Sequence, residues 1–197
     1  MTKPRIGVVI GSTRPGRFAD KPAEWIAERA GDKFDVEVLD LRDYELPFYN
    51  ETTSPSYGKL ENDQALRWQE KLGEFDGFII LAAEYNHGPT AVLKNALDHA
   101  FHEWGRKPVA FIGYGGVGGA RAVEQLRLVA IELRMAPISP AVHILMLDFL
   151  AVYQGEKSLG ELDHLNKSAD DMLTQLEWWA NTLKAARLED KPAQEAA

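Results

Sequence analysis

Short apolar runs rich in β-branched residues alternate along this chain with longer segments whose apolar residues recur at helical spacing. The runs cover residues 6–11, 34–40, 77–83, 109–113 and 142–146, and the helical patterns lie near 16–30, 60–73, 89–103, 118–135 and 160–187. Nearly continuous apolar runs are typical of strands covered on both faces. Strands joined by helices form right-handed βαβ units. The pattern therefore predicts an α/β fold with a doubly wound, five-stranded parallel sheet and helices on both faces.

The chain has the length of one domain, and no linker or internal repeat divides it. We expect this domain to span residues 1–187. The polar, proline-containing segment 188–197 is expected to be a disordered tail. The segment 44–58 reads as a long loop with aromatic and proline residues, and loops of that length are often functional.

Composition excludes several classes of function. With 22 basic and 30 acidic residues the formal net charge is −8, which disfavours non-specific binding to nucleic acid or anionic membranes. No apolar run approaches the ~20 residues of a membrane span, and the first residues lack a signal peptide's features, so we expect a cytoplasmic protein. The chain has no cysteine, so redox chemistry would require a bound cofactor.

The loop after the first predicted strand has the composition of an anion site. Glycines let backbone N–H groups turn inward, hydroxyl side chains add donors, and the following helix N-terminus favours negative charge. Arginine forks match phosphate oxygens. The candidate phosphate ligands are Gly11, Ser12, Thr13, Arg14, Gly16 and Arg17.

Two alternatives exist for this loop. Gly11 to Gly16 matches the spacing of a nucleoside-triphosphate P-loop, but that motif continues with Lys and then Ser or Thr, whereas this chain continues with Arg17 and Phe18. The parts that do the triphosphatase chemistry are therefore missing. The other alternative is a tight turn between strand and helix with no ligand.

Ligands of doubly wound sheets bind beyond the carboxyl ends of the strands, so the loops after the third and fourth strands are the next candidates. Tyr85 offers a flat face for stacking, and Asn86 offers both a donor and an acceptor. Packing of Tyr85 at the helix entry is the alternative. The candidate ligands in this segment are Ala83, Glu84, Tyr85, Asn86 and Gly88.

The loop 113–119 contains five glycines, which would let a flat ligand lie against bare backbone N–H groups. Its G-x-G-x-x-G spacing matches a dinucleotide fingerprint only weakly, because it follows the fourth strand and Ile138 stands about twenty residues on, where an acid would bind a ribose. We assign this loop to the edge of a flat ligand. Packing at the helix start is the alternative.

Two other constellations are set aside. His99 and His102 have a spacing that metal ligands can use, but no second cluster faces them in the sequence, so we predict a solvated helix and no metal site. No G-x-S-x-G elbow is present, which disfavours hydrolase chemistry.

Taken together, these segments resemble the NADPH-dependent FMN reductase family, which includes flavin, quinone, azo-dye and chromate reductases. The resemblance spans residues 4–187. It is carried by Gly11-Ser12-x-Arg14, Leu46-Pro47-Phe48-Tyr49-Asn50, Glu84-Tyr85-Asn86, the segment 92–98 and Gly115-Gly116. It departs from many members at Arg17, where they have serine, and at Ala83, where they have proline.

The resemblance implies a flavodoxin-like fold, bound FMN, and NADPH or NADH as reductant. It implies that Ser12, Arg14, Gly16 and Arg17 hold the FMN phosphate. It also implies that the isoalloxazine lies along Glu84, Tyr85, Asn86 and Gly88, with its pyrimidine edge near Gly115, Gly116 and Gly118. The flavin would do the chemistry, so no catalytic residue is assigned. A small-molecule electron acceptor, a ping-pong mechanism and a homodimer or homotetramer follow as expectations. The alternatives are an FMN electron carrier and an FMN-dependent sensor.

Overall fold

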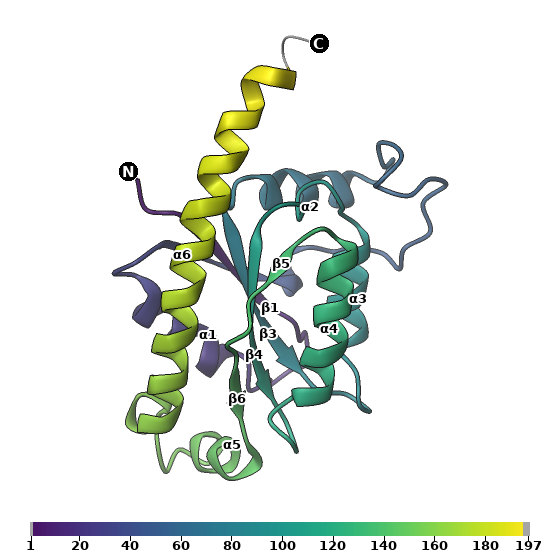
Figure 1. The fold of residues 1–197 in the computed structure, drawn as a ribbon. Coiled ribbons are helices and arrows are strands. Elements are labelled where there is room, and N and C mark those ends of the chain that lie inside the picture. Colours follow the sequence, from purple (N-terminus) through teal and green to yellow (C-terminus); the bar gives the residue numbers. More distant parts are fainter. Residues whose placement is uncertain (1, 195–197) are drawn as a thin grey trace.

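The computed structural model describes residues 2–194, and within them six parallel strands form one sheet (Figure 1). The order is β2-β1-β3-β4-β5, with β6 also paired to β4. This is the flavodoxin-like order, so the predicted doubly wound α/β fold is confirmed. The strands are β1 (Arg5–Ile10), β2 (Asp35–Asp40), β3 (Gly77–Ala83), β4 (Pro108–Tyr114), β5 (Ala136–Pro137) and β6 (Val142–Ile144).

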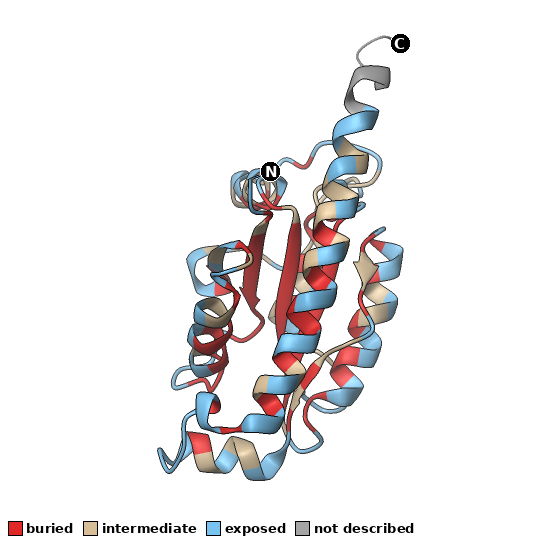
Figure 2. Cartoon of the chain, turned by 60° about the vertical axis from the view of Figure 1, so that its left-hand side comes forward, coloured by how far each residue is buried: buried red, intermediate tan, exposed pale blue. Residues whose placement is uncertain are grey.

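Helices cover both faces of the sheet (Figure 1). They are α1 (Asp20–Ala30), α2 (Asp63–Gly73), α3 (Ala91–Asp98), α4 (Ala120–Glu132), α5 (Met146–Tyr153) and α6 (Asp163–Gln194), with short 3-10 turns η1 (Leu41–Asp43) and η2 (Leu159–Glu161). Side chains of α1 and α6 form one core with Ile6 and Val8 of β1. Those of α2, α3 and α4 form the other with Val9, because successive side chains of a strand point to opposite faces. Figure 2 shows the central strands buried between these layers.

The last edge of the sheet differs from the predicted single strand. Both β5 and β6 pair with β4, and the chain between them leaves the ladder. Pro140 lies in this gap and has no N–H to donate, which is typical of an interrupted edge strand. The helix α5, which follows β6 directly, was not predicted.

The long helix α6 runs past residue 187, where the apolar repeat fades. The expected disordered tail 188–197 is therefore helical as far as Gln194, and its last residues, 195–197, lie outside the described residues. Within residues 2–194, no helix is both long enough and apolar enough to cross a membrane.

The loop 44–58 is hydrogen-bonded to α3. This helix ends at Asp98, a few residues before the end predicted from the sequence. Asn95 accepts a hydrogen bond from Tyr49 N at 2.9 Å and donates one to Pro47 O at 2.8 Å. His99 is fully buried, with Nε2 3.0 Å from the same Pro47 carbonyl. The prediction of a solvated helix was therefore wrong for His99, which caps α3 and packs against the loop.

Candidate functional site

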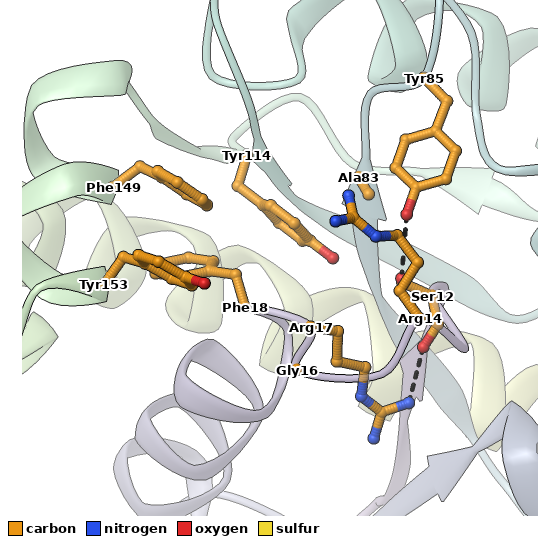
Figure 3. A pocket seen from close by; sticks show the side chains of 10 residues that line it. All are labelled: Ser12, Arg14, Gly16, Arg17, Phe18, Ala83, Tyr85, Tyr114, Phe149 and Tyr153. Carbon is orange, nitrogen blue, oxygen red and sulfur yellow. Dashed lines mark hydrogen bonds between the residues drawn. The ribbon is translucent and has the colours of Figure 1, made fainter.

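A cavity lies at the carboxyl ends of β1, β3 and β4, where the loop after β1 meets the segment after β3 and Tyr114 at the end of β4 (Figure 3). The reason is topological, because parallel strands all end at one edge of the sheet. The first loop forms its floor, β3 and β4 supply its back, and α5 supplies one wall. The lining residues are Ser12, Arg14, Gly16, Arg17, Phe18, Ala83, Tyr85, Tyr114, Phe149 and Tyr153.

The first loop is anchored where it leaves β1. Gly11 N donates to Leu81 O at 3.1 Å, and a Cβ on Gly11 would lie 2.6 Å from that oxygen, so only glycine allows this approach. Thr90 caps α3 by accepting from Leu93 N, and its hydroxyl donates to Gly11 O. The start of the loop is thus held by β3 and by the N-terminus of α3.

Beyond this anchor the loop offers donors that the protein does not use. Within residues 2–194, the backbone N–H groups of Ser12, Thr13, Arg14 and Gly16 donate to no protein acceptor. Gly16 has φ +63° and open space around it, so the turn leaves the backbone bare. Arg14 is exposed and forms no ion pair in the same range. Unpaired N–H groups beside an unpaired guanidinium form an anion-binding surface.

Arg17 occupies a different place from the one expected. Its side chain is 2% exposed, and its guanidinium donates to Asp40 at 2.6 and 2.7 Å and to Asp20 at 2.5 and 2.8 Å. It also donates to Ser12 O at 2.6 Å, which braces the loop from below (Figure 3). The Arg17 charge is therefore paired within the protein, whereas the sequence suggested a guanidinium free to bind phosphate. The sequence could not reveal this, because Asp40 reaches Arg17 only through β1–β2 pairing.

The Arg17 charge is compensated by the carboxylates of Asp40 and Asp20. Burial by itself raises the pKa of Asp40, but hydrogen bonds from Arg17 and Arg42 outweigh it and hold that pKa well below its usual range. Burial lowers the pKa of Arg17, and the bonds to Asp40 and Asp20 raise it to a larger extent. Arg14 is therefore the uncompensated cation of the loop.

The segment after β3 forms a tight turn over residues 85–88. Tyr85 N and Gly88 O are 2.9 Å apart, Gly88 N and Tyr85 O are 3.0 Å apart, and Asn86 and His87 have φ +50° and +71°. Positive φ at both central residues defines a type I′ turn. The turn presents Tyr85 at the cavity, where its hydroxyl lies 3.4 Å from Ser12 Oγ (Figure 3).

Glu84 faces away from the cavity, toward the start of α4. Its side chain is 4% exposed and accepts from Arg121 Nε at 2.6 Å and from Arg121 N at 3.1 Å. Arg121 Nη1 lies 2.8 Å from His87 Nε2, so that ring nitrogen is the acceptor. Burial raises the Glu84 pKa, but the Arg121 hydrogen bonds give a net lowering. Arg121 and His87 were missed by the sequence reasoning, and they tie the turn to α4.

The glycine loop after β4 divides into an open part and a packed part. Gly115 has φ +139° and Gly116 is exposed, and neither N–H donates to a protein acceptor within residues 2–194. Gly118 and Gly119 are buried instead. A Cβ on Gly118 would lie 2.9 Å from His143 Cβ, and one on Gly119 would lie 2.6 Å from Tyr114 N. Gly118 therefore serves packing, and Gly115 and Gly116 offer bare backbone.

An aromatic wall that the sequence did not predict closes one side of the cavity. Phe18 lies 4.4 Å from Phe149 and 5.4 Å from Tyr114, ring centroid to centroid, and Phe149 stacks on Tyr153. Two of these rings belong to α5. Tyr114 is 6% exposed, and its hydroxyl has no hydrogen-bond partner among the residues described.

Comparison with known proteins identifies the group to which this site belongs. A model of the NADPH-dependent FMN reductase family matches residues 4–146. An NAD(P)H-dependent FMN reductase of Schizosaccharomyces pombe is 38% identical over 145 residues, covering 71% of this chain and 72% of the relative. A 2-hydroxy-1,4-benzoquinone reductase of a Burkholderia species is 33% identical over 136 residues, covering 66% and 71%.

The solved structures agree at the level of the fold. FerB, a flavoenzyme NAD(P)H:(acceptor) oxidoreductase from Paracoccus denitrificans, superposes with a TM-score of 0.64 at 21% identity, covering 92% of this chain and 98% of that one. The family match and the S. pombe relative each span most of the chain. The chain thus belongs to the NADPH-dependent FMN reductase family, as an oxidoreductase that uses FMN and NAD(P)H.

Proposed function

We propose that the FMN phosphate binds over the loop 12–16 and that its ring system extends past the Tyr85 turn to Gly115 and Gly116. The observation that carries this proposal is the group of unused N–H donors beside the uncompensated Arg14. Phosphate oxygens are the acceptors that such a surface fits. The bare backbone at Gly115 and Gly116 supports a flat ring there, because no side chain stands between ligand and N–H.

The residues around the ring orient it and tune its charge. The exposed Gly116 N–H, with that of Gly115, would donate to the ring's pyrimidine edge and stabilise negative charge there. Tyr85, held by the type I′ turn, would contact the ring system near Ser12. Bound FMN supplies hydride acceptance from NAD(P)H and delivery to a second substrate, so no protein side chain needs to act as acid or base in that transfer.

We further propose that the second substrate is a small planar acceptor such as a quinone or a flavin. One face of the ring would lie on the protein and leave the other open, so the nicotinamide and the acceptor would use one slot in turn. The name of the 2-hydroxy-1,4-benzoquinone reductase relative supports a quinone. Alternate use of one slot gives parallel double-reciprocal plots with NADPH and a quinone as the varied substrates.

The test is an anaerobic half-reaction on the FMN-loaded protein. We expect NADPH to bleach the visible flavin band within about a second, since enzyme turnover is typically above ~1 s⁻¹, and a quinone to restore it. Free FMN at the same concentration is the control. Bleaching by neither NADPH nor NADH beyond that control would refute the reductase proposal and favour an electron carrier.

We also infer a homo-oligomer, a dimer or tetramer, in which α5 takes part. This helix carries the cavity wall on one side, while Leu147 and Leu150 remain exposed on it, as does Leu145 just before it. Exposed apolar residues clustered beside a ligand site are typical of protein contacts. Light scattering on the purified protein tests the inference, and a monomer at micromolar concentration would contradict it.

A further inference from the structure

Tyr114 carries a buried hydroxyl that the protein leaves without a partner. It is the last residue of β4, is 6% exposed, and has no acceptor or donor for Oη among the residues described. Buried hydroxyls in folded proteins are nearly always hydrogen-bonded, because burying one unpaired is costly. A group that breaks this rule at the wall of a ligand cavity points to a ligand atom as its partner.

The direction of the side chain identifies which part of the cavity it serves. The Tyr114 ring packs against Phe18, with the two ring centroids 5.4 Å apart, and Phe18 packs in turn against Phe149. Figure 3 shows the hydroxyl directed away from Phe149 and toward the side on which Ser12 and Arg14 lie. The phenol therefore faces the loop with the unused N–H groups, and Tyr85 lies on the same side.

The charges around Tyr114 favour an anionic partner. The titratable groups that face the phenol are Tyr85, Arg17, Asp20 and Arg14. Arg17 and Asp20 compensate each other, which leaves Arg14 as the free charge. Burial, aided by Tyr85, raises the pKa of the Tyr114 phenol, so the hydroxyl keeps its proton and remains a donor at neutral pH.

We propose that Tyr114 Oη donates a hydrogen bond to the phosphate of FMN and so helps this chain to discriminate FMN from riboflavin. The proposal rests on the FMN site proposed above. It makes Tyr114 a specificity-determining residue supplied by a strand end, in addition to the backbone donors of the loop. The ribityl chain is the other possible partner of the hydroxyl, and the test separates the two.

The test compares Tyr114→Phe with the wild type and with Tyr44→Phe, using apoprotein and either FMN or riboflavin. Tyr44 packs on Trp68 against the opposite face of the sheet, so it controls for loss of a phenol elsewhere. Because a hydrogen bond to a charged group is involved, we expect Tyr114→Phe to raise the FMN dissociation constant about 10- to 100-fold. The riboflavin constant should not change, and the apoprotein should melt no lower than the wild type, because the variant removes an unpaired buried hydroxyl.

Two results overturn the proposal. An unchanged FMN dissociation constant removes any role for the hydroxyl in binding, and equal weakening of both flavins assigns it to the ribityl chain. Flavin binding by the wild-type protein distinguishes failure of the Tyr114 assignment from failure of the proposed phosphate site. If wild-type protein prefers FMN to riboflavin and Tyr114→Phe keeps that preference, only the Tyr114 assignment fails. If the wild type shows no preference, the phosphate site itself is refuted.

Discussion

Arg17 is predicted to stabilise the apoprotein, although its sequence context suggests a phosphate ligand. Replacing it with Met keeps the apolar stem and removes the guanidinium that joins Asp20, Asp40 and the Ser12 carbonyl. Removing one partner of a buried ion pair costs about 3–5 kcal/mol. Asp20 is half exposed and Asp40 keeps Arg42 at 2.7 Å, so we reduce this to about 2–4 kcal/mol for Arg17→Met.

The assay is urea unfolding of the apoprotein at several pH values, with Arg14→Met as the matched control. Arg14 is exposed, so its variant should change the unfolding free energy by less than about 0.5 kcal/mol. The same control should weaken FMN binding by about 1–2 kcal/mol, because it removes the uncompensated charge facing the phosphate. Substitution of Arg17 should thus lower mainly the stability of the apoprotein, whereas substitution of Arg14 should lower mainly the affinity for FMN.

The pH dependence follows from Asp40. Its pKa in the folded protein lies below the unfolded value, so its contribution is present above the unfolded pKa of about 3.9 and is lost as pH falls through the folded value. Arg17 stays charged throughout this range. The difference between wild type and Arg17→Met should therefore be constant between about pH 5 and 7 and shrink below about pH 4. Wild-type stability in Arg17→Met apoprotein, together with lost FMN affinity, would refute the reasoning and make Arg17 a direct ligand.

Three further predictions concern the neighbouring loops and the cofactor. Glu84→Gln should lower the unfolding free energy by about 1–2 kcal/mol at pH 7 and by less below about pH 4, because the lowered Glu84 pKa adds stability only while the carboxylate is ionised. Equal melting temperatures at pH 7 would contradict this. Gly119→Ala should prevent folding or cost more than about 4 kcal/mol, because its Cβ would meet Tyr114 N at 2.6 Å. Gly16 has nearly the same φ as Gly119 but open space around it, so Gly16→Ala should lower the unfolding free energy by only about 1–2 kcal/mol. Similar unfolding midpoints for the two variants would show that the contact with Tyr114 N does not cause the loss of stability. Titration calorimetry should give FMN a lower dissociation constant than riboflavin. Equal dissociation constants would rule out phosphate binding by the loop 12–16.

Local sequence patterns were sufficient for the elements that carry the sheet. The apolar run of β3 is buried at all seven positions, and its length and β-branched content predict a central strand without tertiary information. The helices α2 and α4 were found from their apolar period, although their ends moved by a few residues because caps such as Asn62 compete with the period. By contrast, the helix α5 was not predicted, because it is short and its apolar residues do not form one stripe.

The roles of individual polar side chains depended on partners far along the chain. Glu84 reads as a ligand beside Tyr85, but Arg121 binds its carboxylate from α4. His99 reads as a surface residue of a polar helix turn, but the Pro47 carbonyl covers it. In each case the partner is more than thirty residues away, and no local propensity or spacing encodes such a pairing.

The sequence by itself determined the doubly wound sheet, the three loops at its carboxyl edge and the family to which they belong, because strand periodicity, glycine positions and donor-rich loops are local properties. Only the tertiary structure decided which loop charge is free. Pairing of β1 with β2 brings Asp40 beneath the first loop, where it neutralises Arg17 and leaves Arg14 exposed. The same packing buries Tyr114 with its hydroxyl unpaired, because burial and hydrogen-bond satisfaction depend on neighbours that meet only when the chain folds.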